Sequence, residues 1–145
     1  IILIRWWTDG CEYCYRSSDA LNEWYQKYHE SGLEILGIYH PKPLERQPSD
    51  EEIRSYIFDK GFKFPIGLDL QWQNLNMVWL HCTKRSFTSV SFLLNRTGRI
   101  IYIHEGGEYH KIFQKGHEQC VTDYNKLDSI LRVELDTSTI IEKSK

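Results

Sequence analysis

The sequence lacks several features that would assign it to a broad class of protein. No apolar run approaches the length of about 18 residues that a membrane span needs, and no long block of like charge or internal repeat is present. The formal net charge of −2 lacks the basic footprint of a nucleic-acid-binding protein. With 145 residues and an apolar share of 41%, the chain suits one domain with a sizeable core. We expect that domain over 1–135 and a polar tail over 136–145.

Cysteine is sparse, and its spacing restricts the chemistry. Of the four cysteines, only Cys11 and Cys14 form a CxxC motif. A zinc site built on this motif needs a second ligand pair of suitable spacing, which Cys82 and Cys120 do not supply. Redox chemistry is therefore favoured over metal binding, and we expect no metal site. The sequence leaves open whether Cys82 and Cys120 pair, stay free or act as a relay.

The CxxC motif lies between a predicted strand and a predicted helix. Ile1–Trp7 is an apolar run typical of a buried strand, and apolar residues recur with helical spacing over 21–28. In the first helical turn, positions i and i+3 share a face, so the two thiols can close on each other. Free N–H groups and the positive helix end stabilise a thiolate there. We interpret Cys11 as the exposed attacking thiolate and Cys14 as the more buried resolving thiol.

Periodicity and capping signals predict the remaining elements. Gly32 ends the first helix, Ser49 and Glu52 form a capping box, and a turn over 95–98 joins a hairpin. After the first helix we expect strands over 33–39, 62–68, 89–94 and 99–104, with helices over 50–60, 71–80 and 118–135. A long loop over 105–117 precedes the last helix. This order predicts an α/β fold, with a central mixed β-sheet flanked by helices on both faces.

Several segments carry a family resemblance. They are Trp7-Thr8 before the CxxC, Trp24-Tyr25, residues 32–38, His40-Pro41, Phe64-Pro65 and the hairpin over 91–100. With the element order, they resemble the thioredoxin fold. The helix–strand insertion between the βαβ unit and the C-terminal hairpin resembles the redoxin branch (the AhpC/TSA superfamily). Within it, the chain is similar to TlpA/ResA-type thiol–disulfide oxidoreductases.

The resemblance implies an enzyme that exchanges disulfides with a disulfide-containing or dithiol protein. Cys11 would attack, a mixed disulfide would form, and Cys14 would resolve it. We expect no cofactor and a monomer. The chain starts without Met inside a predicted strand, so we expect that strand to be trimmed and a leader to be absent. The resemblance implies an extracytoplasmic protein, periplasmic or membrane-tethered, with the cytoplasm as the alternative.

Two departures from the family pattern concern the substrate groove. Ser89 takes the place of the usual cis-proline, and because a cis bond before another residue costs several kcal/mol we expect a trans bond there. Gly10 precedes the first cysteine where many relatives have Trp, which predicts a more open rim. The groove residues that we expect are Trp7, Thr8, Gly10, Tyr13, Ser89, Val90, Gly106 and Gly107.

Three charged or titratable residues could tune the thiols. Arg5 suits a solvated strand end, or alternatively a charge beneath the CxxC that favours the thiolate. Glu12 would raise a thiolate pKa by repulsion, unless it is exposed and screened. His40 could shuttle the Cys14 proton, although a His at this point more often caps a loop.

Two alternative functions remain. Thr8, three residues before Cys11, resembles the peroxidatic site of peroxiredoxins, for which Arg85 or Arg96 could supply the cation. A non-catalytic binding module would instead hold its partner on an aromatic rim. That rim would consist of Trp7, Tyr13 and Tyr15.

The long loop before the last helix is rich in potential metal ligands. His104, Glu108, His110, His117 and Cys120 gather there. Their spacings match no familiar metal cage, so we favour a solvated loop that forms a partner-contacting rim beside the active site.

Overall fold

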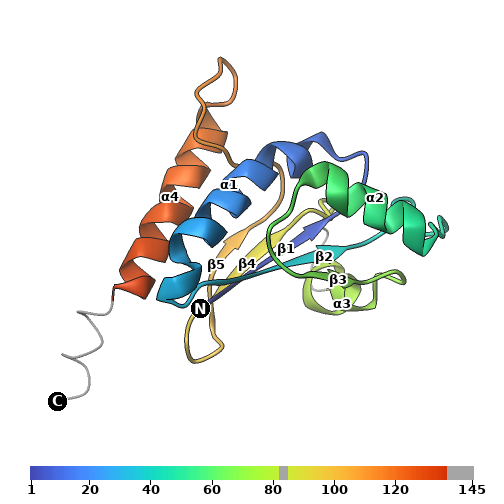
Figure 1. The fold of residues 1–145 in the computed structure, drawn as a ribbon, viewed down its shortest axis with the longest axis horizontal. Coiled ribbons are helices and arrows are strands. Elements are labelled where there is room, and N and C mark those ends of the chain that lie inside the picture. Colours follow the sequence, from blue (N-terminus) through green and yellow to red (C-terminus); the bar gives the residue numbers. More distant parts are fainter. Residues whose placement is uncertain (82–84, 137–145) are drawn as a thin grey trace.

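The computed structural model describes residues 1–81 and 85–136 and has a five-stranded sheet at its centre (Figure 1). The strands lie in the order β3-β2-β1-β4-β5. β1 pairs in parallel with β2, as β2 does with β3, whereas β4 runs antiparallel to both β1 and β5. Their bounds are Ile2–Trp7, Glu34–Tyr39, Ile66–Leu68, Ser91–Leu94 and Ile100–His104 for β1 to β5. The predicted mixed sheet is confirmed.

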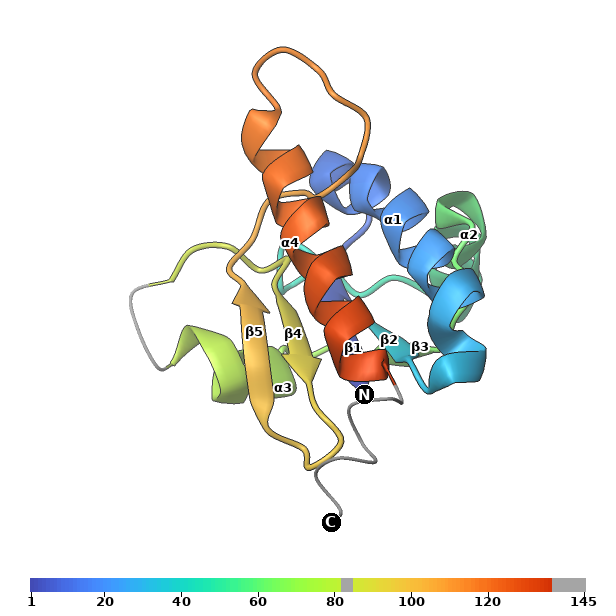
Figure 2. The ribbon, with the colours of Figure 1, turned by 90° about the vertical axis from the view of Figure 1, so that its left-hand side faces the viewer.

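Helices cover both faces of the sheet. On one face, α1 (Glu12–Tyr28) and α4 (Glu118–Leu135) pack side by side, with α2 (Asp50–Lys60) beyond α1 (Figures 1 and 2). Alternate strand residues such as Leu3 and Leu93 enter the core beneath α1 and α4. The opposite strand face packs against α3 (Gln73–Leu75) and the π-helical turn η2 (Asn76–Leu80). Among the described residues, no helix is both long enough and apolar enough to cross a membrane.

Local signals in the sequence explain where the helices begin and end. A 3₁₀ turn, η1 (His29–Ser31), follows α1, and Gly32 ends it with φ of 100°, a left-handed conformation that favours glycine. At the start of α2, the Ser49 side chain accepts from the Glu52 N–H and the Glu52 carboxylate accepts from the Ser49 N–H. The predicted capping box is therefore confirmed.

The segment over 71–80 is not the single helix that its spacing predicts. The carboxylate of Asp69 accepts hydrogen bonds from the N–H groups of Asn74 and Leu75, at 3.1 and 2.8 Å. Trp72 has φ of 56°, a left-handed conformation in which no α-helix continues. The α-helix therefore begins only at Gln73 and passes into the π-helical turn.

The ends of two predicted elements also differ. β3 is shorter than expected because Pro65, which has no N–H, ends the pairing on its N-terminal side, and β3 lies at the edge of the sheet. Asp136 follows α4 directly, and the rest of the predicted polar tail, residues 137–145, lies outside the described residues.

Candidate functional site

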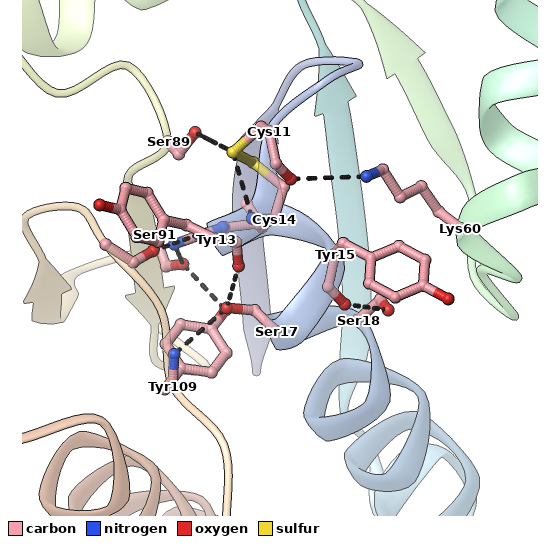
Figure 3. The surroundings of a disulfide bond; sticks show 12 residues. Cys11, Tyr13, Cys14, Tyr15, Ser17, Ser18, Lys60, Ser89, Ser91 and Tyr109 are labelled. Carbon is pink, nitrogen blue, oxygen red and sulfur yellow. Dashed lines mark hydrogen bonds between the residues drawn. A yellow bond between two sulfur atoms is a disulfide. The ribbon is translucent and has the colours of Figure 1, made fainter. Parts of the chain in front are cut away.

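Cys11 and Cys14 form a disulfide at the start of α1 (Figure 3). Gly10 turns the chain from β1 toward the helix with φ of 66°, which a residue with a Cβ rarely adopts. Cys11 is the N-cap of α1, and its Sγ accepts from the Cys14 N–H at 3.1 Å. The two Cα atoms lie 5.3 Å apart. Cys14 is 2% exposed, whereas Cys11 is partly exposed, so only Cys11 is open to a partner.

Ser89 contacts both sulfur atoms. Its Oγ lies 3.1 Å from Cys14 Sγ and 3.5 Å from Cys11 Sγ. Lys42–Pro43 is the one cis peptide bond among the described residues. The bond before Ser89 is therefore trans, as expected. A hydroxyl therefore takes the place of the proline ring against the dithiol.

Lys60 is a neighbour of the dithiol that the sequence did not reveal. Its ammonium lies 3.5 Å from the backbone oxygen of Cys11 and 4.9 Å from the centre of the Tyr15 ring. Burial lowers the pKa of Lys60. The residue is the last of α2, within the insertion, so no motif spacing links it to the CxxC. Only the packing of α2 beside α1 brings it to this place.

Arg5 is buried, so the expectation of a solvated strand end is wrong. It is 1% exposed, and burial lowers its pKa. The guanidinium donates to Ser91 Oγ at 3.2 Å and to the Gly107 oxygen at 2.8 Å, and it lies over the Tyr109 ring. These contacts hold the loop after β5 against the sheet. A role for Arg5 in favouring the thiolate stays a prediction.

His40 lies in the interior at the end of β2. It is 0% exposed, and its two ring nitrogens have no hydrogen-bond partner among the described residues. The ring meets Trp72 edge-on, with centroids 5.3 Å apart. Burial lowers the pKa of His40 to about 4. The imidazole is therefore neutral, and it caps no loop through its side chain. Its role as a proton shuttle stays a prediction.

Glu12 is exposed and paired. Its carboxylate lies 3.3 Å from Arg16, one turn further along α1. The same guanidinium reaches the buried Glu108 at 3.2 Å. The charge of Glu12 is therefore solvated and partly compensated by Arg16.

A groove runs beside Cys11, and four of the expected residues line it: Thr8, Gly10, Tyr13 and Ser89. Trp7 and Val90 are 0% exposed, so it is wrong to place either side chain in the groove, or Trp7 on an aromatic rim. Each packs in a hydrophobic cluster, Trp7 with Tyr39 and Val90 with Phe92. Gly106 lies instead in a neighbouring hollow beside Phe87, and Gly107 contributes its oxygen to Arg5.

The sequence analysis missed part of this groove. The missed lining residues are Asp9, Glu12, Lys42, Ser86, Phe87 and Thr88. Three of them directly precede Ser89, so their proximity in the sequence was the available signal. Lys42 follows the end of β2, and only the tertiary fold brings it to Cys11.

The arginines proposed for a peroxidatic site lie elsewhere. Arg85 stacks over the Trp79 ring, 3.6 Å from its centre. Arg96 lies beside Gly32, at the opposite end of the sheet from Cys11. Thr8 is buried, and its Oγ1 has no partner among the described residues. Thr8 lines the groove with Cys11, but neither of the two proposed arginines does.

Four of the predicted loop residues form a cluster. Potential ligand atoms of Glu108, His110, His117 and Cys120 all lie within 4.8 Å of one another, and Glu108 is buried. The expectation of a solvated loop is wrong for Glu108, which is buried, whereas His110, His117 and Cys120 are partly exposed. His104 lies apart and contacts Asp123 at 3.2 Å. Cys120 is not in a disulfide, and Cys82 lies outside the described residues.

Comparisons with known proteins agree with this geometry, although no protein-family model matches the chain. Protein DipZ of Mycobacterium tuberculosis (strain CDC 1551 / Oshkosh) is 29% identical over 112 residues, which are 76% of this chain and 15% of DipZ. The thiol-disulfide oxidoreductase ResA of Bacillus anthracis is 23% identical over 100 residues, which are 69% of this chain and 51% of ResA. The chain thus matches about half the length of ResA and a small part of DipZ.

Solved structures show the same fold. A thiol:disulfide interchange protein DsbE from Chlorobium tepidum has a TM-score of 0.69 at 16% identity, covering 92% of this chain and 79% of its own. A thiol-disulfide isomerase from Corynebacterium glutamicum has a TM-score of 0.66 at 16% identity, covering 93% and 80%. The predicted thioredoxin-like fold is confirmed, and so is the similarity of this chain to TlpA/ResA-type thiol–disulfide oxidoreductases.

Proposed function

We propose that the chain is a thiol–disulfide oxidoreductase that exchanges disulfides with a protein partner through Cys11 and Cys14. The observation that carries the proposal is the disulfide at the N-terminus of α1, with one sulfur at a groove and the other buried. Similarity to ResA, whose name states this activity, supports it.

The reaction transfers two electrons. In the reduced chain, the Cys11 thiolate attacks a sulfur of the substrate disulfide, so one S–S bond forms as another breaks, and the departing thiolate takes up a proton. The Cys14 thiolate then attacks Cys11 Sγ, which closes the disulfide of the chain and releases the second substrate thiol. The substrate is reduced and the chain oxidised. The reverse sequence oxidises a dithiol.

The surroundings of Cys11 favour its thiolate. The Cys14 N–H already points at Cys11 Sγ, and the positive end of the α1 dipole adds to its effect. Lys60 places a cation close to the Cys11 backbone. The Ser89 hydroxyl can donate to either sulfur when one becomes a thiolate.

The groove beside Cys11 suits an extended polypeptide. Residues 86–89 line it together with residues 8–13, which include Cys11. The lining carries Lys42 and Asp9 as well as Phe87 and Tyr13, so the groove offers both charged and aromatic contacts. We infer a protein substrate that presents a cystine or a dithiol in an exposed segment.

The proposal includes compartment and assembly. A secreted disulfide oxidoreductase of Mycobacterium tuberculosis has the same fold, with a TM-score of 0.53. This likeness supports an extracytoplasmic location, where protein disulfides form and persist. Both cysteines and the whole groove come from one chain, so a monomer suffices for the reaction.

Reduction of insulin by dithiothreitol tests the proposed activity. The wild-type chain should accelerate the reaction, and Cys11→Ser should abolish the acceleration because the exposed thiol of the CxxC motif is lost. Cys14→Ser should accumulate a mixed disulfide between Cys11 and its substrate, visible by mass spectrometry. Cys120→Ser is the matched control and should keep the wild-type rate. Equal rates for the wild type and Cys11→Ser would contradict the proposal.

A further inference from the structure

Four side chains with metal-binding atoms meet at the start of α4. Glu108 and His110 come from the loop between β5 and α4, which rises beyond the N-terminal end of that helix before returning to it (Figure 2). His117 is the N-cap of α4, and Cys120 follows in its first turn. Positions three residues apart share a helix face, so the backbone itself presents His117 and Cys120 together.

Four of the six separations between these atoms are close to those of a tetrahedral zinc cage, and all six are within 4.8 Å. Zinc lies about 2.0 to 2.3 Å from its N, O and S ligands, so ligands at tetrahedral corners are roughly 3.3 to 3.8 Å apart. The contact from His110 Nε2 to His117 Nδ1 is 3.3 Å, and that from Cys120 Sγ to His117 Nδ1 is 3.8 Å. Glu108 Oε1 lies 3.7 Å from Cys120 Sγ and 3.0 Å from His117 Nδ1. An ion can therefore enter with only small side-chain movements.

We propose that Glu108, His110, His117 and Cys120 bind one Zn²⁺ ion at a second site, separate from the dithiol. The donor set of one carboxylate, two imidazoles and one thiolate consists of the ligand types that zinc takes in proteins. With both acidic groups ionised, the two negative charges balance the ion. Four protein ligands leave no open position, so the site is structural and not hydrolytic.

The neighbourhood of Glu108 also fits a metal ligand. The Arg16 guanidinium donates to both carboxylate oxygens, at 3.2 and 3.3 Å, and so fixes the orientation of the side chain. Ligating carboxylates are commonly oriented by such outer contacts. The exposed apolar side chains of Ile112 and Phe113 lie in the loop that the ion would close. Zinc would join the two ends of this loop and fix it beside α1.

Metal titration of the full chain tests this site. With the Cys11–Cys14 disulfide intact, the chelator-treated protein should bind one Zn²⁺ per chain. Co²⁺, used as the spectroscopic probe, should give the visible bands of a tetrahedral ion and a thiolate charge-transfer band. The Cys11→Ser/Cys14→Ser variant should bind equally well, which separates this site from the CxxC motif and from the proposed exchange activity.

Ligand variants sharpen the test. Cys120→Ser should lose the charge-transfer band, and both Cys120→Ser and His110→Gln should weaken Zn²⁺ binding by at least about tenfold. His29→Gln is the control, because His29 is partly exposed and contacts Glu34 far from the cluster. Circular dichroism establishes that each variant is folded. No stoichiometric binding, unchanged affinity in both ligand variants, or loss of binding with the CxxC cysteines would each overturn the proposal.

Discussion

At the starts of α1 and α4, a side chain at the N-cap faces a cysteine three residues later. In α1 the pair is Cys11 and Cys14, and in α4 it is His117 and Cys120. The spacing of the two pairs is the same, but the N-cap backbones differ, with ψ of 105° at Cys11 and 23° at His117, and so do the surroundings. Ser89 and Lys60 lie beside the first pair, whereas the buried carboxylate of Glu108 lies beside the second. The same i, i+3 spacing thus serves the proposed disulfide exchange at the start of α1 and the proposed cation binding at the start of α4.

The two helix starts also differ in how well they stabilise negative charge on a cysteine sulfur. The Cys14 N–H and the helix end stabilise negative charge on Cys11 Sγ. Burial and the carboxylate of Glu108 raise the pKa of Cys120. A helix N-terminus therefore does not by itself make a thiol reactive, since a neighbouring anion opposes its effect. Predictions that compare the two regions follow, starting with the largest effect.

The histidines provide the largest expected difference. Burial lowers the pKa of His40 to about 4 from 6.5, whereas the His117 side chain is partly exposed. Between about pH 4 and 6.5, the unfolded chain binds a proton at His40 that the folded chain does not bind. The free energy of unfolding of the oxidised protein should therefore rise with pH across this window, by up to about 3 kcal/mol, and level off above it.

Urea unfolding at several pH values measures this effect. His40→Phe keeps a ring against Trp72 but cannot take up a proton, so its stability should change much less between pH 4 and 6.5. Equal pH profiles for the wild type and His40→Phe would assign the dependence to other groups.

Alkylation compares the two thiols directly. In the reduced protein with metal removed, iodoacetamide at neutral pH should modify Cys11 at least about tenfold faster than Cys120. The Cys14 N–H stabilises a thiolate at Cys11, whereas burial and the Glu108 carboxylate raise the pKa of Cys120, and each unit of thiol pKa changes the thiolate fraction up to about tenfold. Mass spectrometry of the labelled peptides gives both rates from one sample. Equal rates would remove the proposed contrast between the two helix starts.

Ser89→Ala should have a smaller effect. Loss of the hydroxyl removes a group that can donate to one sulfur or the other, so the Cys11 thiolate should be less stabilised and the pKa of the thiol should rise. The pH dependence of Cys11 alkylation in the Cys14→Ser background measures it, with Ser86→Ala as a control on the groove wall. A pKa that stays the same would show that Ser89 only fills the place of the family's proline.

Local patterns predicted most of the fold. Alternation, capping residues and the glycines at helix ends depend on neighbours in the chain, and so the sequence suffices for α1, α2, α4 and the hairpin. The prediction of a single helix over 71–80 is wrong because Asp69, which precedes the periodic stretch, caps a helix that begins only at Gln73. The buried position of Arg5 depends on Ser91 and Gly107, which only the tertiary fold brings to it.

The sequence predicts the parts of the candidate site that depend on neighbouring residues, but not the parts that depend on tertiary contacts. The exposure of Cys11 and the burial of Cys14 follow from the helix start, which the sequence contains. Lys60 and Lys42 reach the dithiol from other elements, and no spacing relates them to it. The sequence identifies the residues of the α4 cluster as potential ligands, but their spacings match no familiar metal cage and so do not predict a site. Its ligand distances depend on how the loop folds back.

Arg16 forms ion pairs with carboxylates of two different regions of the molecule. One guanidinium divides its contacts between Glu12, next to Cys11 in sequence, and Glu108 in the cluster. Solvent screens the charge of Glu12, whose side chain is 81% exposed, whereas the side chain of Glu108 is 6% exposed and needs Arg16 to compensate its charge. One guanidinium of α1 therefore anchors the loop before α4 at its buried end, although neither cysteine of the disulfide contributes to that anchor.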